Sequence, residues 1–298
     1  MKRNDLLKYL FTLLFAVVMV FALEAKVFAA TPGWEDLKSF DGITKRTKVY
    51  TELDVTGDKK KDTIKVVYTP KGDMSDPDFV DGEIKILVNG KRVFKEARYG
   101  SPQWAIRLIW LKNGKVIFYI SSTVGSGDNG EAGLYQYQSG KLRQLYDLDK
   151  FTDGAGGDAD GYTIQKVTGN KIVIERSTQF HLTGMLYYNM TLVYKNGKLK
   201  LASNQMKTTG RFSQSIATGN GNGWTAAYTM KVYNKAGSKK VAFKIKKGSK
   251  IEFKKVIYKN NKFYFQIREL SGKKRTGYIQ NPKASKYPFY FEECVFVG

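Results

Sequence analysis

Tight turns that recur along the chain constrain its fold more than any other sequence feature. Five dipeptides, each followed by Lys, separate short runs rich in Val, Ile, Tyr and Phe: Asn89-Gly90, Asn113-Gly114, Ser139-Gly140, Gly169-Asn170 and Asn196-Gly197. Asn-Gly suits the positive φ angles of a type I′ turn, whose twist matches that of two antiparallel strands. The turns recur every 24 to 29 residues, and no long helical period accompanies them. The pattern therefore predicts an all-β protein built of successive hairpins.

The apolar runs between these turns indicate how the strands are buried. Residues 106–111 and 116–120 are apolar on both faces, as expected for strands in the middle of a sandwich or barrel. Residues 133–137 and 190–194 alternate, as half-exposed strands do. Most closed propellers need at least four blades of four strands each. Five hairpins supply too few strands for such a propeller. We therefore predict an antiparallel sandwich or irregular barrel, with a propeller-like fragment as the alternative.

Charge divides the chain into two parts. The 298 residues include 50 Lys and Arg against 27 Asp and Glu, a formal net charge of +23. Residues 30–206 carry 26 basic and 21 acidic residues, whereas residues 207–298 carry 20 basic and only four acidic ones. The Gly- and Asn-rich passage at 218–223 is typical of a linker or long loop. We predict an antiparallel β-domain at 30–206, followed by a linker and a basic domain at 207–298.

The first 29 residues have the features of a cleaved signal peptide. Basic residues precede an apolar stretch at 9–23, and Val27 and Ala29 supply small residues at the −3 and −1 positions. The apolar run of about 15 residues is shorter than the roughly 20 that span a bilayer, although a retained anchor is the alternative. A single cysteine leaves no disulfide partner. We expect a secreted, cell-wall-associated protein of a Gram-positive bacterium, with no membrane anchoring after cleavage.

The order of elements between residues 228 and 280 resembles the bacterial SH3 (SH3b) family. A strand and a polar loop precede a strand that ends at Lys246-Lys247-Gly248, and a later hairpin leads to Gly277-Tyr278-Ile279. The chain departs from the family pattern at Phe263-Tyr264, where Trp is frequent, and at Tyr278, which replaces the Trp of Gly-Trp-Val. The resemblance implies an SH3-like β-barrel of the kind that holds exported proteins on peptidoglycan or other wall polymers.

The same segment concentrates positive charge, which attracts polyanions. Lysines alternate with apolar residues at 243–246 and at 250–254, so one strand face should be basic and the other should be core. Phosphate-rich teichoic acid is the expected anionic partner, whereas export argues against nucleic acid as a physiological ligand. Trp224 is expected to be an exposed stacking platform. The alternative is that the lysines only keep an exported barrel soluble. The predicted ligand-binding residues are Lys239, Lys240, Lys244, Lys246, Lys247, Lys250, Lys254, Lys273, Lys274, Arg275, Trp224 and Tyr278.

Residues 54–62 resemble the DxNGDGxxD calcium loops of FG-GAP and dockerin-like repeats. Oxygen-bearing side chains occupy loop positions 1, 3, 5 and 9, and Ca²⁺ prefers six to eight oxygen ligands. The resemblance implies a weak structural Ca²⁺, although Lys59 replaces a Gly and Lys65 stands where a Glu is usual. A polar turn capped by its own Asp side chains is the alternative. A second acidic stretch, at 149–161, is predicted to be a surface loop. The expected calcium ligands are the side chains of Asp54, Thr56, Asp58 and Asp62 and, at position 7, the backbone carbonyl of Lys60.

Few residues suit catalysis. The single histidine, His181, makes a Ser–His–Asp hydrolase unexpected, and Cys294 is more typical of a small buried hydrophobe than of a nucleophile. We therefore predict no catalytic residue and a secreted, non-catalytic cell-envelope protein whose N-terminal domain has an unknown ligand. One alternative is a wall or polysaccharide hydrolase with paired carboxylates in the N-terminal domain. Another is a regulator that presents this domain to a second exported protein.

Overall fold

A computed structural model describes residues 31–41, 44–71, 81–100, 102–124, 128–149, 161–209, 223–284 and 289–294. The predicted signal peptide, the acidic residues 153–160 and most of the Gly-rich passage lie outside the described residues. Every regular element in the described ranges is a β-strand, so the all-β prediction is confirmed. No helix in these ranges is long and apolar enough to cross a membrane.

Two antiparallel sheets form the first half of the protein. The four-stranded sheet has the order β2-β3-β4-β5, and the five-stranded sheet has the order β1-β6-β7-β8-β9. The bounds in the four-stranded sheet are β2 (Arg46–Tyr50), β3 (Ile64–Lys71), β4 (Asp81–Val88) and β5 (Lys91–Arg98). Those in the five-stranded sheet are β1 (Gly33–Phe40), β6 (Gln103–Trp110), β7 (Val116–Val124), β8 (Asp128–Gln138) and β9 (Lys141–Asp147).

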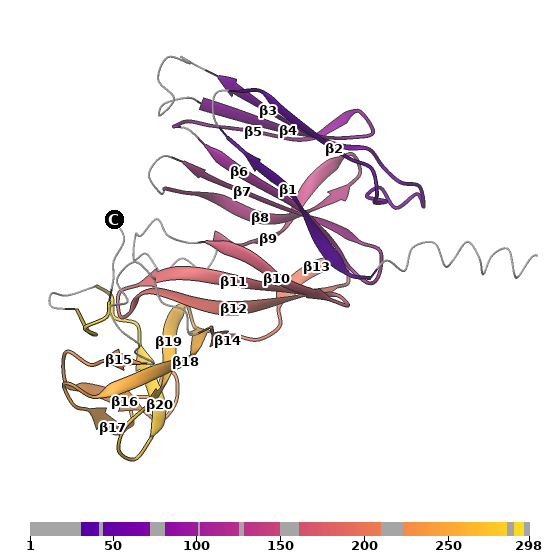
Figure 1. Ribbon diagram of the computed structural model, residues 1–298. Helices are drawn as coiled ribbons and strands as arrows, with labels where there is room; N and C mark the ends of the chain where they lie inside the picture. The colour runs from indigo at the N-terminus through magenta and orange to yellow at the C-terminus, as the bar shows by residue number, and fades with distance from the viewer. Residues whose placement is uncertain are drawn as a thin grey trace, which may run out of the picture.

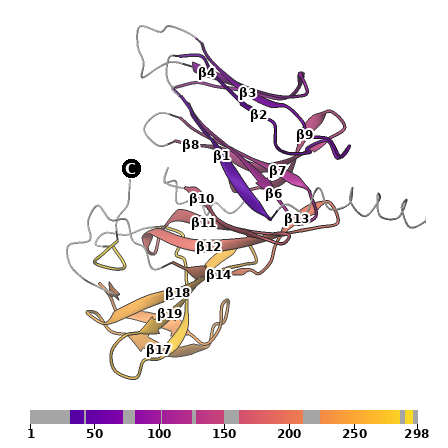
Figure 2. The ribbon, with the colours of Figure 1, turned by 45° about the vertical axis from the view of Figure 1, so that its right-hand side comes forward.

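The second half forms a single eleven-stranded sheet that begins as a flat layer and ends as a curled, barrel-like unit. Its flat part contains β10 (Tyr162–Thr168), β11 (Lys171–Phe180), β12 (Gly184–Lys195), β13 (Lys198–Leu201) and β14 (Gln205–Thr208). Its curled part contains β15 (Trp224–Thr225), β16 (Met230–Tyr233), β17 (Val241–Ile245), β18 (Lys250–Lys259), β19 (Lys262–Glu269) and β20 (Thr276–Gln280). Figures 1 and 2 show the sheets as stacked layers, with the barrel-like unit beyond the last layer.

The middle layer explains the strands that are apolar on both faces. Ile106 and Phe118 are fully buried in a core shared with β2–β5, whereas Ile109 and Ile117 are fully buried in a core shared with β10–β13. Successive side chains of a strand point to opposite faces, so β6 and β7 supply both cores at once. The prediction of strands in the middle of a sandwich is confirmed.

Positive φ angles confirm the type I′ turn at three of the five predicted positions, whereas at Asn113-Gly114 and Gly169-Asn170 only the glycine has a positive φ. Both central residues have positive φ at Asn89-Gly90, Ser139-Gly140 and Asn196-Gly197, as a type I′ turn requires. The flanking residues pair directly, as in the register Lys195↔Lys198. Each of these turns therefore joins its two strands with only two residues.

The predicted domain boundary falls inside a strand. β14 spans residues 206 and 207, pairs with β12 through Asn189↔Lys207, and pairs with β18 through Met206↔Val256. One hydrophobic core also runs continuously from β6 to the barrel-like unit. The two predicted domains therefore share a sheet and a core.

Candidate ligand-binding surface

Lysines and apolar residues alternate on β17 and β18, as the sequence predicted. Phe243 and Ile251 are buried, whereas Lys244, Lys250 and Lys254 are exposed. The other predicted lysines around these strands are also exposed: Lys239, Lys240, Lys246, Lys247, Lys273 and Lys274. We call the exposed Lys244, Lys246, Lys247, Lys250 and Lys254 the lysine face.

Trp224 does not belong to this surface, and its prediction as an exposed platform is wrong. Its side chain is only 3% exposed. It packs edge-on against Phe253 and Phe291, with ring centroids 5.2 and 5.9 Å apart. β15 carries the indole onto the inner side of β18 through the pairing Trp224↔Ile251. The apolar ring gains more free energy in this aromatic cluster than on the surface.

Two other predicted ligand residues are already engaged with neighbouring side chains. Arg275 donates two hydrogen bonds of 2.8 Å to Glu269, and its guanidinium lies 4.2 Å from the ring centroid of Phe243. The bond from Arg275 holds the pKa of the Glu269 carboxyl below its ordinary value. The hydroxyl of Tyr278, which is half-buried, accepts a 3.0 Å bond from Gln266. Lys254 also lies 3.5 Å from the Glu252 carboxylate, so the other predicted lysines, rather than Arg275 or Lys254, carry the available charge.

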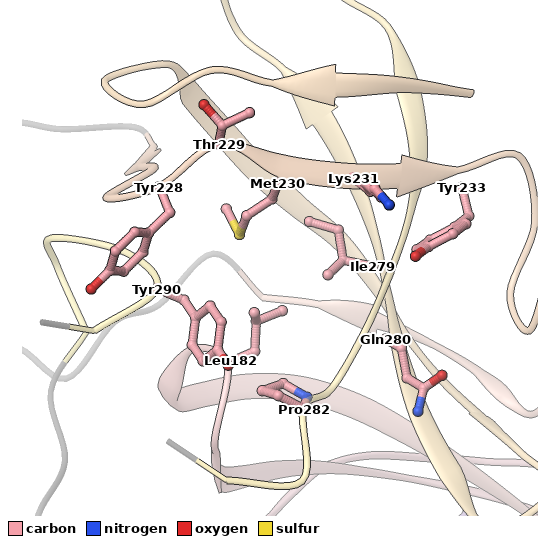
Figure 3. A pocket seen from close by; sticks show the side chains of 10 residues that line it. All are labelled: Leu182, Tyr228, Thr229, Met230, Lys231, Tyr233, Ile279, Gln280, Pro282 and Tyr290. Carbon is pink, nitrogen blue, oxygen red and sulfur yellow. The ribbon is translucent and has the colours of Figure 1, made fainter. Parts of the chain in front are cut away.

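A groove of about 340 Å³ opens beside β16 (Figure 3). Its aromatic side chains come from residues at the start of the barrel-like unit in the sequence, Tyr228 and Tyr233, and from Tyr290 near its end. Leu182 lines the groove from the turn between β11 and β12. The residues that line it are Leu182, Tyr228, Thr229, Met230, Lys231, Tyr233, Ile279, Gln280, Pro282 and Tyr290. Tyrosine rings beside a lysine and a glutamine form a surface on which a sugar ring can stack and donate or accept hydrogen bonds.

The sequence did not indicate this groove because its residues come from four separate segments. The β11–β12 turn reaches the barrel-like unit through a 3.0 Å bond from the Leu182 amide to the Asn281 side chain. The thiol of Cys294 donates to the Leu182 carbonyl at 3.3 Å. The groove also continues into the lysine face, because Lys231 stands directly opposite Lys244 in the β16–β17 register.

The predicted calcium loop is a network of hydrogen bonds to its own carboxylates. Asp62 is 1% exposed and accepts bonds from the backbone amides of Val55 and Thr56, at 2.6 and 2.8 Å. Its other oxygen accepts a bond from the side-chain amide of Asn89. Asp54 in turn accepts bonds from two backbone amides further along the loop, at 2.6 and 2.7 Å.

The hydrogen-bond donors in this loop occupy the oxygen atoms that a bound cation would need. Each carboxylate oxygen of Asp54 and Asp62 faces an N–H group, and Asp58 accepts a 2.8 Å bond from the amide of Lys60. A Ca²⁺ ion needs six to eight oxygens turned toward it. In the ranges that the structure describes, no three metal-ligating side chains gather in one place. The donor set fits the polar-turn alternative, and calcium binding stays a prediction that this geometry does not support.

Ionisable side chains in the described ranges, including a half-buried carboxylate of the N-terminal half, are engaged in structural contacts. Asp149 accepts bonds from the Ala132 amide at 2.6 Å and from the Tyr162 hydroxyl at 2.9 Å, while burial raises the pKa of its carboxyl. Burial also raises the pKa of the Cys294 thiol to about 12, so this thiol stays protonated near neutral pH. His181 lies half-buried in the β11–β12 turn. These contacts do not select any pair of carboxylates as a catalytic centre.

Comparison with protein-family models, with curated proteins and with solved structures gives no match to this chain. The likeness to the SH3b family and to calcium loops therefore rests on the quoted residues alone. Inferences about function rest on the surface chemistry described above.

Proposed function

We propose that this protein is an exported, non-catalytic protein that binds an anionic polymer of the cell wall through its lysine face. The one-sided arrangement of the lysines carries the proposal. Five exposed lysines lie on β17, on β18 and on the turn between them, and a packed aromatic core holds the opposite side of these strands. The signal-like N-terminus and the SH3b resemblance support the same environment outside the cell.

The spacing of the lysines favours a polymer over a small anion. Neighbouring charges act together when they lie within a Debye length, about 8 Å at physiological ionic strength. Lys231 and Lys244 stand directly opposite each other, and like charges in such pairs destabilise a sheet. A polymer with repeated phosphates would neutralise this repulsion along the strand. A single small anion would reach only one or two lysines.

The tyrosine-lined groove adds a second kind of contact. Ring stacking does not depend on salt, whereas attraction between exposed charges weakens as salt is added. A polymer whose sugar units enter the groove and whose phosphates follow the lysines would use both surfaces. Salt dependence therefore separates the contribution of the groove from that of the charge.

Co-sedimentation with purified Gram-positive walls tests the proposal. The assay uses the whole chain from Ala30 onward, after the predicted signal peptide. A fragment starting at Lys207 is unsuitable, because it would cut β14, the strand that links the two halves. The test variant is Lys244→Gln/Lys246→Gln/Lys250→Gln. The matched variant is Lys45→Gln/Lys207→Gln/Lys283→Gln, which removes the same charge from exposed positions elsewhere.

We expect the test variant to bind walls at least tenfold more weakly at physiological salt, and the matched variant to bind within twofold of the unmodified protein. Walls stripped of teichoic acid should retain little protein in modest salt. Equal binding by both variants would refute a role for the lysine face. Strong, salt-resistant binding to stripped peptidoglycan would assign recognition to the groove.

A further inference from the structure

The lysine-bearing turns of the N-terminal half, although far apart in the sequence, gather at one end of the stacked sheets. The backbone amide of Lys112 donates a 2.9 Å bond to the Gly169 carbonyl, which joins the β6–β7 turn to the β10–β11 turn. The amide of Tyr194 donates a 2.9 Å bond to the Asn170 carbonyl, which brings the β12–β13 turn to the same place. Three turns from two sheets therefore form one surface.

The remaining turns lie at the same end. The register Phe118↔Tyr135 places the start of β7 beside the end of β8, so the β8–β9 turn adjoins the β6–β7 turn. The β4–β5 turn is bonded to the loop at 54–62, because the side chain of Asn89 accepts from the Thr63 amide and donates to Asp62. Figure 1 shows these turns and this loop along one edge of the layers.

This end of the stack is strongly basic. Ten cationic side chains are exposed there, and none of them makes an ion pair within the described ranges: Lys59, Lys60, Lys91, Arg92, Lys112, Lys115, Lys141, Lys171, Lys195 and Lys198. We call them the turn-end surface. Asp58 is an exposed acid in their midst, and Lys61 is paired with Glu52 at 2.6 Å.

Charged side chains of both signs lie at the other end of the same sheets. Asp41 follows β1, Asp81 begins β4, and Asp147 ends β9, each at the end of its sheet away from the hairpin turns. Cations at that end are paired, as Arg46 is with Asp41 at 2.8 Å and Lys71 is with Glu83 at 2.9 Å, unlike the ten cations of the turn-end surface. A small net charge over residues 30–206 therefore does not exclude a strongly basic surface at one end of the sheets.

We propose that the turn-end surface is a second binding surface for a linear polymer with repeated phosphate groups. The five turns contribute Asn, Gly, Ser and Lys, so the turns themselves offer charge without exposed aromatic or aliphatic side chains that insert into a bilayer. Two exposed apolar side chains, Trp34 and Val49, lie near this end on β1 and β2 and not in the turns. The cations of the turn-end surface spread across three layers that stack about 10 Å apart, which suits an extended chain.

Two separate basic surfaces would let one molecule hold two polymer chains. The turn-end surface occupies one edge of the layered part, whereas the lysine face belongs to the barrel-like unit beyond the last layer (Figures 1 and 2). Bridging rests on the proposed function of the lysine face, but polymer binding at the turn end does not. Linking two sites in one molecule also raises the overall strength of attachment.

A two-chain capture assay tests both statements. Biotinylated inorganic polyphosphate is fixed on beads, the protein from Ala30 onward is loaded and washed, and fluorescein-labelled inorganic polyphosphate is then added. The turn-end variant is Lys115→Gln/Lys171→Gln/Lys198→Gln, from the three turns that hydrogen bonds hold together. Its controls are the lysine-face variant and the matched variant described above, each of which removes three charges.

We expect the turn-end variant to load onto the beads within twofold of the unmodified protein and to capture the second chain at least fivefold less. The lysine-face variant should lose second-chain capture to a similar degree, and the matched variant should keep it. Capture by the turn-end variant equal to that of the unmodified protein or of the matched variant would overturn the proposal.

Two further outcomes separate the proposals from each other. If the lysine-face variant loads and captures normally while the turn-end variant no longer loads, the proposed function and the bridging both fail and only the turn-end contact stands. Vesicles that contain phosphatidylglycerol form the other arm. If the protein binds these vesicles more tightly than polyphosphate, and the turn-end variant loses vesicle binding, the ligand of the turn-end surface is a membrane surface. That result would overturn the proposal.

Discussion

The substitution Asp62→Asn tests the carboxylate that organises the loop before β3. Asp62 is almost completely buried and accepts two backbone amides, from Val55 and Thr56, on one oxygen. It also accepts the side-chain amide of Asn89, which joins the loop to the β4–β5 turn. An asparagine has the same shape but only one accepting atom. Some of these donors would therefore face an NH₂ group in place of an oxygen.

The cost follows from the number of donors left without an acceptor. A buried polar group that loses its partner costs about 1–3 kcal/mol. One or two such donors give an expected loss of about 2–4 kcal/mol in the free energy of unfolding. For a chain of this size, about 2–4 °C of Tm corresponds to each kcal/mol, so Tm should fall by about 5–15 °C.

Thermal unfolding followed by circular dichroism, on the protein from Ala30 onward, measures this loss. Asp58→Asn is the matched control, because Asp58 is exposed and accepts one amide bond, from Lys60. Its Tm should change by less than about 3 °C, since exposed substitutions change stability by about 0.5 kcal/mol. An Asp62→Asn variant with the Tm of the unmodified protein would refute the reasoning.

The same measurement decides the calcium interpretation. With the carboxylate oxygens facing amides, 1 mM Ca²⁺ is expected to leave Tm unchanged in all three proteins. If Ca²⁺ raises the Tm of the unmodified protein by several degrees but does not raise the Tm of either variant, the loop is a calcium site.

Three further perturbations test the packing and the ionisable groups. Trp224→Ala should lower stability by about 3–5 kcal/mol in urea unfolding, because it removes the indole between Phe253 and Phe291; a normal midpoint would contradict its burial. Hydrogen bonds from Lys85, Lys71 and Lys95 lower the pKa of Glu83 from 4.5 to about 2, so this carboxylate stabilises the fold above pH 4.5 and loses that contribution as pH falls toward 2. Glu83→Gln should therefore be less stable than the unmodified protein at pH 7, with a urea-midpoint difference that narrows between pH 4.5 and 2; a constant difference would refute this pairing. The Cys294 thiol, whose pKa burial raises to about 12, should react with a disulfide reagent at pH 8 only after urea unfolding, and fast reaction of the folded protein would contradict its burial.

Local patterns were enough to predict the strands and their faces. The φ angles of Asn-Gly turns, the two-sided apolar runs of β6 and β7 and the alternation on β17 and β18 depend on neighbours a few residues apart. Lys244 and Phe243 could therefore be assigned to opposite faces before any pairing was known. The same reasoning failed for Trp224, because its Gly- and Asn-rich neighbours indicate a loop and do not reveal the aromatic cluster that receives the ring.

The sequence by itself therefore determined the all-β class, the hairpins and the basic character of the second half. Only the tertiary structure decided which distant residues meet: Leu182 with Tyr228 and Tyr290 in the groove, and the lysines of five turns at one end of the layers. The physical reason is that strand register and layer stacking bring together residues separated by tens of positions, whereas periodicity records only near neighbours. The net charge of a segment has the same limitation as periodicity, because it sums the charges and does not record where they lie in the structure. The small net charge of residues 30–206 thus concealed a strongly basic end of the stacked sheets.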